Sequence, residues 1–216
     1  MDRRQRYREQ TRQEVKRIAL EQLAEHGIAG ISVNAIGKRL GVTGPAIYRY
    51  FANRDALLTE LIADGYHGLA DTLEAAIDPA APPAERTRAV ATALRDWAVA
   101  VPHRYLLLFG TPIPGYQAPA HTLDAANRAM TALLATAPPD PGPTTVAEPL
   151  YGQLSEWGEQ LGHNHLTQRQ QHWGMTVWSR LHGVLSLEVA GQFSLTGLDP
   201  GLLYRAEVEA LIAWWE

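Results

Sequence analysis

Apolar residues recur along most of the chain at the three- and four-residue spacing of amphipathic helices. Sustained alternation of apolar and polar residues, the usual pattern of a half-buried strand, is nearly absent. We therefore predict an all-α protein of about ten helices. The predicted helices span residues 10–26, 33–40, 44–51, 53–77, 85–101, 103–109, 118–137, 146–161, 167–193 and 200–215.

Capping residues mark the ends of the early helices. Ser32, Thr43 and Asn53 each precede an apolar periodic segment and are predicted N-caps. Gly41 stands where a left-handed residue closes a helix, and Pro45 stands in a first turn, where its missing N–H costs nothing. Loops are predicted where prolines gather, at 78–83, 110–116 and 138–143.

Residues 32–51 thus form two short helices joined by a three-residue turn, with Val42 expected to fill the gap between the helices. This is the arrangement of a helix-turn-helix, whose second helix enters the DNA major groove. The groove is about 12 Å wide and admits one α-helix. The pattern alone is not specific, because other compact helix pairs imitate it.

Charge is divided unevenly along the chain. Residues 1–54 hold eleven Lys/Arg against five Asp/Glu, whereas residues 55–216 hold eight against eighteen, and the whole chain has a net charge of −4. This division indicates that the first quarter meets a polyanion, although a solvated basic tail with no partner would show it too. Residues 1–9, with Arg3, Arg4, Arg6 and Arg8, are predicted to be a basic arm that enters the minor groove, or else a disordered tail that attracts DNA generally.

A family resemblance makes the pattern specific. From residue 31 the chain reads ISVNAIGKRLGVTGPAIYRYFANRDALL. The Tyr-x-x-Phe pair at 48 and 51 and the Asn-Arg-Asp-x-Leu-Leu run at 53–58 closely resemble the N-terminal domain of the tetracycline-repressor (TetR) family, over about residues 10–60. Residues 178–183, with 109–116 upstream, more loosely resemble a C-terminal domain of that family named for its Trp and His-Gly signature. The resemblance implies a homodimeric, ligand-responsive transcription regulator, with a helix-turn-helix domain at 1–54 and an effector-binding and dimerisation domain at 55–216.

The DNA contacts are predicted on two grounds. The resemblance implies that Tyr48, Tyr50 and Arg54 reach the DNA backbone, the alternatives being a packed core tyrosine at 48 and an ordinary surface residue at 50. Residues at the start of the recognition helix are the candidates for contacts with base edges, and residues of the preceding helix are expected to add further contacts. These candidates are Thr43, Gly44, Pro45, Ala46 and Arg49, supplemented by Asn34 and Lys38. Arg49 is equally well explained as a solvent-facing charge.

The acidic, tryptophan-rich remainder is the expected effector side. Pockets in helical bundles lie between helices and combine apolar walls with a few polar groups. The candidate wall residues are Trp97, Tyr105, Leu108, Phe109, Tyr116, Met130, Leu133, Trp157, Trp178 and His182. Ordinary core packing is the alternative for each. Apolar walls with few basic groups favour a neutral or cationic lipophilic effector.

The resemblance also implies that the last two long helices of each subunit form a four-helix bundle with those of a second copy. Apolar spacing supplies the candidate contacts, which are Val177, Leu181, Val184, Leu185, Glu188, Leu203, Leu211 and Ile212. A two-fold dimer matches a palindromic operator of double-stranded DNA.

Other classes of protein find little support. The chain has no cysteine, phosphate loop, nucleophile elbow or helical His-Glu-x-x-His, so neither catalysis nor a cofactor is expected. His163 and His165 do not share a helix face, which argues against a metal site with His172. No apolar run approaches the roughly 20 residues of a membrane span, and no secretory signal opens the chain, so we expect a cytoplasmic protein.

The remaining alternative is a DNA-binding regulator without a small-molecule ligand, controlled by a protein partner or by its abundance. Repression is favoured over activation by family analogy alone.

Overall fold

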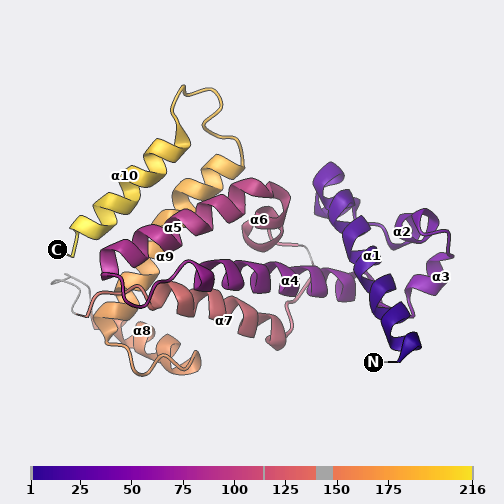
Figure 1. Ribbon diagram of the computed structural model, residues 1–216, viewed down its shortest axis with the longest axis horizontal. Helices are drawn as coiled ribbons and strands as arrows, with labels where there is room; N and C mark the ends of the chain where they lie inside the picture. The colour runs from indigo at the N-terminus through magenta and orange to yellow at the C-terminus, as the bar shows by residue number, and fades with distance from the viewer. Residues whose placement is uncertain (1, 114, 140–147, 216) are drawn as a thin grey trace. The chain divides into compact units, whose positions relative to one another are not determined.

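The computed structural model describes residues 2–113, 115–139 and 148–215, and every regular element in these ranges is a helix (Figure 1). The predicted all-α fold is thereby confirmed. The elements are α1 Arg3–His26, η1 Ile28–Gly30, α2 Val33–Arg39, α3 Gly44–Ile47, α4 Arg54–Ala75, α5 Pro83–Ala100, α6 Pro102–Phe109, α7 Ala120–Leu134, α8 Glu148–Gln160, α9 Gln168–Val189 and α10 Pro200–Ala213. Residues 140–147, which hold part of the predicted loop at 138–143 and the predicted helix start at 146, lie outside the described residues.

Two of the predicted caps form as expected. Ser32 Oγ accepts a hydrogen bond from the Ala35 N–H at 3.3 Å, and Asn53 Oδ1 accepts one from the Ala56 N–H at 2.7 Å. Gly41 has φ +70°, the left-handed backbone predicted for it. Thr43 is the N-cap residue of α3, but its side chain makes no capping bond.

The first helix is longer than predicted. It begins at Arg3 rather than near residue 10, so the basic segment 3–9 is helical and not an extended arm or a disordered tail. The Asp2 N–H donates to Gln5 Oε1 at 3.3 Å, and Gln13 donates to Glu9 Oε1 at 2.7 Å one turn farther along. These local bonds compensate for the weak apolar pattern of the segment, which is why periodicity alone missed it.

The third helix is shorter than predicted. Regular α-helix ends at Ile47 instead of Phe51, and the Tyr50 N–H bonds the Ile47 carbonyl at 2.8 Å in a tighter three-residue turn. The Phe51 N–H also reaches the Ile47 carbonyl, at 3.1 Å. Val42 is 42% exposed, so the prediction that it fills the gap between the two helices was wrong.

The chain forms two compact units. The headpiece unit comprises residues 1–65 and 103–123, and the bundle unit comprises 66–102 and 124–216. Helix α4 runs from the first unit into the second. The predicted boundary at residue 54 falls within the headpiece unit, and a separate DNA-binding domain that ends there stays a prediction.

Each unit has its own apolar core. In the headpiece unit, buried residues of α1 and α4 and of the α2–α3 pair supply it: Val15, Ile18, Ile36, Ile47, Phe51, Leu57 and Leu58. In the bundle unit, α9 packs against α5, α8 and α10, and Figure 1 shows α10 in yellow alongside α9 in orange. There Trp173, Leu181, Leu211 and Tyr204 are buried, and the Tyr204 hydroxyl donates to the Ala91 carbonyl at 2.9 Å.

Candidate functional site

A buried glycine sets the spacing between α2 and α3. A Cβ atom at Gly37 would lie 3.2 Å from the Val42 carbonyl oxygen and 3.3 Å from the Gly44 nitrogen. The Val42 N–H closes the turn on the Gly37 carbonyl at 2.9 Å. At residue 37 the backbone of α2 therefore packs directly against the backbone of the turn and of the start of α3. The sequence signal was available, because Gly37 follows Ile36 on the inward face of the helix.

Most predicted DNA-contacting residues lie on the exposed surface of this helix pair. The exposed ones are Asn34, Lys38, Thr43, Pro45, Tyr48 and Arg49, and the half-buried ones are Gly44, Ala46 and Tyr50. Tyr48 is 47% exposed, which rules out the packed core tyrosine considered for that position. The Asn34 side chain lies directly against Gly44, where a Cβ atom would collide with it.

The helical start of α1 brings basic residues to the end of the recognition segment. One surface hollow is lined by Arg4 and Arg8 of α1 together with Arg49 and Tyr50. Because Arg4 and Arg8 are four residues apart on a helix, they share one face. We call Arg4, Arg8 and Arg49 the basic patch. Arg3 is exposed on the first turn of α1 and does not line this hollow.

Arg54 is bonded to the backbone that precedes α2. Its Nε donates to the Ile31 carbonyl at 3.1 Å, and its Nη2 donates to the Ile28 carbonyl at 2.6 Å. The half-buried guanidinium thereby holds the η1 segment against the start of α4. This anchoring was not predicted, and a phosphate contact by the same side chain stays a prediction.

Two basic residues that sequence reasoning passed over fasten α1 to α4. Arg12 pairs with Glu60, and its guanidinium lies 4.6 Å from the centre of the Phe51 ring. Lys16, only 8% exposed, donates to Asp64 Oδ2 at 2.7 Å. Part of the positive charge of the first 54 residues therefore serves the fold of the headpiece unit and not a polyanion.

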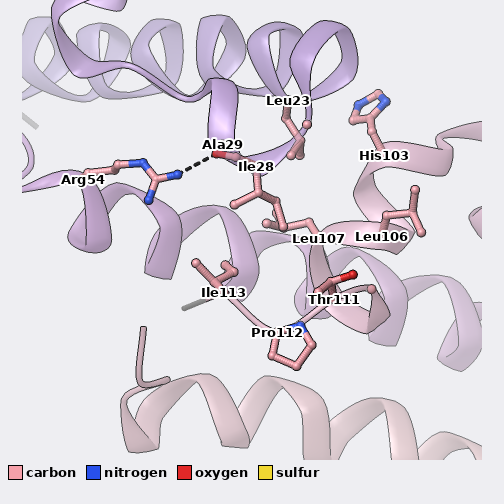
Figure 2. Close-up of a pocket in the computed structure, with 12 residues that line it drawn as sticks. Leu23, Ile28, Ala29, Arg54, His103, Leu106, Leu107, Thr111, Pro112 and Ile113 are labelled. Atoms are coloured by element: carbon pink, nitrogen blue, oxygen red, sulfur yellow. Dashed lines mark hydrogen bonds between the residues drawn. The ribbon is translucent and has the colours of Figure 1, made fainter. Parts of the chain in front are cut away.

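A pocket of about 470 Å³ opens within the headpiece unit (Figure 2). Its walls come from the end of α1, η1, the first residue of α4, α6 and the segment that follows α6. Nine of its twelve lining residues are apolar or glycine, and the other three are Arg54, His103 and Thr111. Burial, with a smaller contribution from the Arg104 charge, lowers the pKa of His103, so its imidazole is neutral at pH 7.

The predicted effector residues divide between the two units. In the headpiece unit, the rings of Tyr105 and Phe109 are 5.1 Å apart, and the Tyr116 hydroxyl lies 3.0 Å from Thr59 Oγ1. Leu108 packs against Gly65, where a Cβ atom would lie 3.1 Å from it. Burial raises the pKa of Tyr105 to about 12.

In the bundle unit, the rings of Trp178 and His182 are 4.0 Å apart, and burial lowers the pKa of His182 to about 4. Trp97 is buried, and so are Met130 and Leu133 on α7. Trp157 is half-buried, with its ring 6.2 Å from that of His163. A pocket formed by these effector candidates stays a prediction.

Most predicted dimer contacts belong to the core of the single chain. Val177, Leu181, Leu185 and Leu211 are fully buried within the subunit and Ile212 nearly so, which corrects their assignment to a surface between subunits. Glu188 is also engaged within the chain, because Arg95 of α5 donates to both of its carboxylate oxygens, at 2.9 and 2.5 Å. Helical spacing identified an apolar stripe correctly but could not tell which partner covers it.

A different face of α9 and α10 remains exposed. On α9 it carries Gly183 and Leu187, the latter 47% exposed, beside the half-buried Val184 of the prediction. On α10 it carries the predicted Leu203, 39% exposed, followed by Ala206 and Ala210. We call Gly183, Leu187, Leu203, Ala206 and Ala210 the outer face.

Neither a metal centre nor a membrane span emerges from the described ranges. Within residues 2–113, 115–139 and 148–215, no three His, Cys, Asp or Glu side chains come together as metal ligands. His163 is buried, and its Nε2 lies 3.4 Å from Thr131 Oγ1. Over the same ranges, no helix combines the length and the apolar character that crossing a bilayer requires.

Comparison with known proteins gives consistent matches along the chain. Residues 17–61 match the family model described as "Bacterial regulatory proteins, tetR family", and residues 87–211 match "Tetracyclin repressor-like, C-terminal domain". The HTH-type transcriptional regulators Mb1846 of Mycobacterium bovis and Rv1816 of Mycobacterium tuberculosis are each 35% identical to this chain over an alignment of 217 positions, which covers 95% of this chain and 92% of the relative.

Solved structures agree with the fold. The crystal structure of SCO4313 is 42% identical, covers 98% of this chain and 100% of its own, and superposes with a TM-score of 0.85. FadR of Bacillus subtilis, solved in complex with stearoyl-CoA, is 18% identical with a TM-score of 0.59, covering 94% of this chain and 99% of its own. At that identity the FadR match shows the fold alone.

Proposed function

The chain belongs to the TetR family of bacterial transcription regulators, and from this premise we propose that it is a ligand-responsive repressor of a palindromic operator. The family assignment makes it a helix-turn-helix DNA-binding regulator. Repression, the symmetry of the operator and the response to a small lipophilic effector are the proposed part. The observation that carries the proposal is the exposed α2–α3 surface with the basic patch beside it.

On the DNA side, two groups of residues have separate roles. Exposed Thr43, Pro45 and Tyr48 lie on or beside the short α3 helix, whose width suits the major groove. Arg4 and Arg8 add charge next to Arg49 without an extended arm, so they strengthen binding to any sequence. Direct readout is thin, because Gly44, Pro45 and Ala46 offer few hydrogen bonds to base edges.

A second copy of the chain is the proposed partner at the outer face. Leucines and small residues in helical register on adjacent helices allow close packing of two helix pairs, as in a four-helix bundle. A two-fold dimer presents two α3 helices to half-sites about one helical turn of DNA apart, or a multiple of that.

Effector control is proposed as a shift between two conformations, only one of which fits the operator. A ligand moves that equilibrium only by the difference in its affinity for the two forms. Support comes from the apolar and aromatic side chains of both units and from the fold shared with FadR, a regulator solved with a bound acyl-CoA. Helix α4, which belongs to both units, is the proposed connecting element.

Fluorescence anisotropy with a fragment of the chain's own promoter tests the proposal. We expect tight binding that weakens steeply with salt, and Arg49→Ala should lower it about tenfold or more. Arg205→Ala, at an exposed position on α10 away from the outer face, is the matched control and should bind as the parent does. Failure to bind DNA even in dilute buffer would refute the proposal. Binding that no compound of a diverse library alters would favour a regulator without a small-molecule ligand.

A further inference from the structure

The pocket of the headpiece unit lies among the elements that carry the helix-turn-helix, and all its lining residues belong to that unit. None of the predicted effector residues lines it. We propose that it is a binding site for a lipophilic carboxylate, a molecule with an apolar body and one anionic head. The site is separate from the pocket that was predicted among the aromatic residues of the effector side.

The walls suit an apolar body. Leu23 and Ile28 face Leu106, Leu107 and Ile113 across the hollow in Figure 2, with Pro112 below them. The volume of about 470 Å³ falls within the range of roughly 300–1,000 Å³ that is usual for small-molecule sites. Leu106 is 38% exposed although it lies beside other apolar side chains. An apolar ligand would cover that surface and gain the corresponding hydrophobic free energy.

The charges at the pocket select an anion. Arg54 stands at one side, and its guanidinium is held in place by the Ile28 and Ile31 carbonyls. His103 stands on the other side in Figure 2, and its imidazole is neutral at pH 7. No Asp or Glu is among the twelve lining residues. A guanidinium without a competing carboxylate favours a carboxylate head over an ammonium or a hydroxyl.

Occupation of the pocket would act on the backbone that leads into α2. The wall includes residues 27–29, and α2 begins at Val33, two residues after the Ile31 carbonyl that Arg54 holds. A carboxylate that accepts hydrogen bonds from Arg54 competes with the Ile28 and Ile31 carbonyls for the same guanidinium. The bound ligand therefore loosens the segment that positions the α2–α3 pair. This regulatory consequence rests on the proposed function, whereas the binding site itself does not.

Isoleucine methyl NMR of the full chain, titrated with sodium decanoate below its micelle-forming concentration, tests the site. We expect saturable shifts of the Ile28 and Ile113 δ1-methyl signals, with Ile77 and Ile212 of the bundle unit unmoved. 1-Decanol should bind about tenfold more weakly, because its hydroxyl accepts from Arg54 without the negative charge and second oxygen of a carboxylate, and decylammonium weaker still, because an ammonium has no acceptor and is repelled by the guanidinium. Shifts confined to Ile77 and Ile212, no shifts at all, or equal affinity for the three probes would each overturn the proposal.

Two tryptophan variants, one on the pocket wall and one off it, distinguish blockage of the pocket from a general effect of the substitution. Leu106→Trp fills the mouth of the pocket and should abolish the decanoate shifts. Leu123→Trp places the same side chain at another exposed leucine of the same unit, off the pocket wall, and should leave them intact. If Leu106→Trp folds and still binds decanoate as the control does, the assigned site is wrong.

Measurement of operator affinity then distinguishes ligand binding in the pocket from its regulatory consequence. With parent protein, saturating decanoate should weaken operator affinity by about fivefold or more, the usual lower range of allosteric coupling, and Leu106→Trp should abolish that response. Pocket binding with unchanged operator affinity would overturn the regulatory role. A chain that binds decanoate in the pocket but does not bind DNA would refute the proposed function, whereas the proposed binding site would still hold.

Discussion

Arg49 and Arg54 are five residues apart in the sequence and have different surroundings. Arg49 is exposed beside Arg4 and Arg8, whereas Arg54 is half-buried with two backbone carbonyls as partners. An exposed guanidinium contributes little to stability and is available to DNA, while a guanidinium that bonds partly buried carbonyls stabilises the fold. We therefore expect Arg49 to contribute mainly to DNA binding and Arg54 mainly to the stability of the headpiece unit.

Replacing Arg54 with Gln should destabilise the headpiece unit by about 2 kcal/mol or more, because it removes two charge-assisted hydrogen bonds to carbonyls. Urea unfolding at constant pH measures the change. Arg49→Gln is the control and should alter stability by less than about 0.5 kcal/mol. If Arg54→Gln instead leaves stability unchanged and lowers the salt slope of DNA binding by about 0.9, the phosphate contact implied by the family resemblance is its main role.

His182 should make the free energy of unfolding depend on pH. Its pKa falls to about 4 in the folded chain because burial disfavours the imidazolium, while the unfolded side chain titrates near 6.5. The unfolded state thus binds the proton more readily, so stability is complete above about pH 6.5 and declines as the pH falls toward 4, by up to about 3 kcal/mol. Chemical unfolding between pH 4 and 7.5 should show a smaller decline for His182→Phe than for the parent. An equal decline in both proteins would contradict this origin.

At the scale of the element, the α2–α3 pair depends on the absence of a side chain at residue 37. Gly37→Ala should separate the two helices by a few tenths of an ångström and destabilise the headpiece unit by about 1–3 kcal/mol, as overpacking does. Operator affinity should fall as well, because the recognition segment loses its fixed position.

The matched control is Gly152→Ala in α8, where a Cβ atom would meet nothing within 4 Å. There the substitution should be neutral or stabilise the chain by about 1 kcal/mol, since alanine favours helix over glycine. Thermal unfolding and operator binding of the two variants decide the matter. Equal behaviour of both would show that close contact at residue 37 is not what holds the pair together.

For the whole molecule, the outer face predicts how the chain assembles. A Cβ atom at Gly183 would meet nothing within 4 Å in the single chain, so Gly183→Arg should leave the subunit fold unchanged. If two outer faces pack together, the new guanidinium is driven into their interface and the protein should sediment as a monomer with about tenfold weaker operator binding. Gly152→Arg places the same side chain on an exposed part of α8 and should remain a dimer. A Gly183→Arg protein that stays dimeric in analytical ultracentrifugation would exclude this face.

Local chemistry determined much of this protein from its sequence. Periodicity and caps gave the helical class and the order of the helices, and the run from residue 31 to 58 gave the family, because these features depend on residues close together in the chain. The exceptions were α1, extended by side-chain bonds at its start, and α3, which tightens after Ile47. The helices predicted at 118–137 and 167–193 also end early, at Leu134 and Val189. All four are effects at helix ends, where periodicity carries least information.

Only the tertiary structure decided which partner each side chain meets. It turned Arg54 toward the backbone before α2, buried Leu181 and Leu211 within the subunit and left Leu187 outside, and opened a pocket between residues about 80 positions apart. A helical stripe records that a face is apolar, but burial against α5 and burial against a second copy lower the free energy through the same hydrophobic effect. That effect has no direction, so the sequence pattern is the same in both cases and the packing of distant segments decides between them.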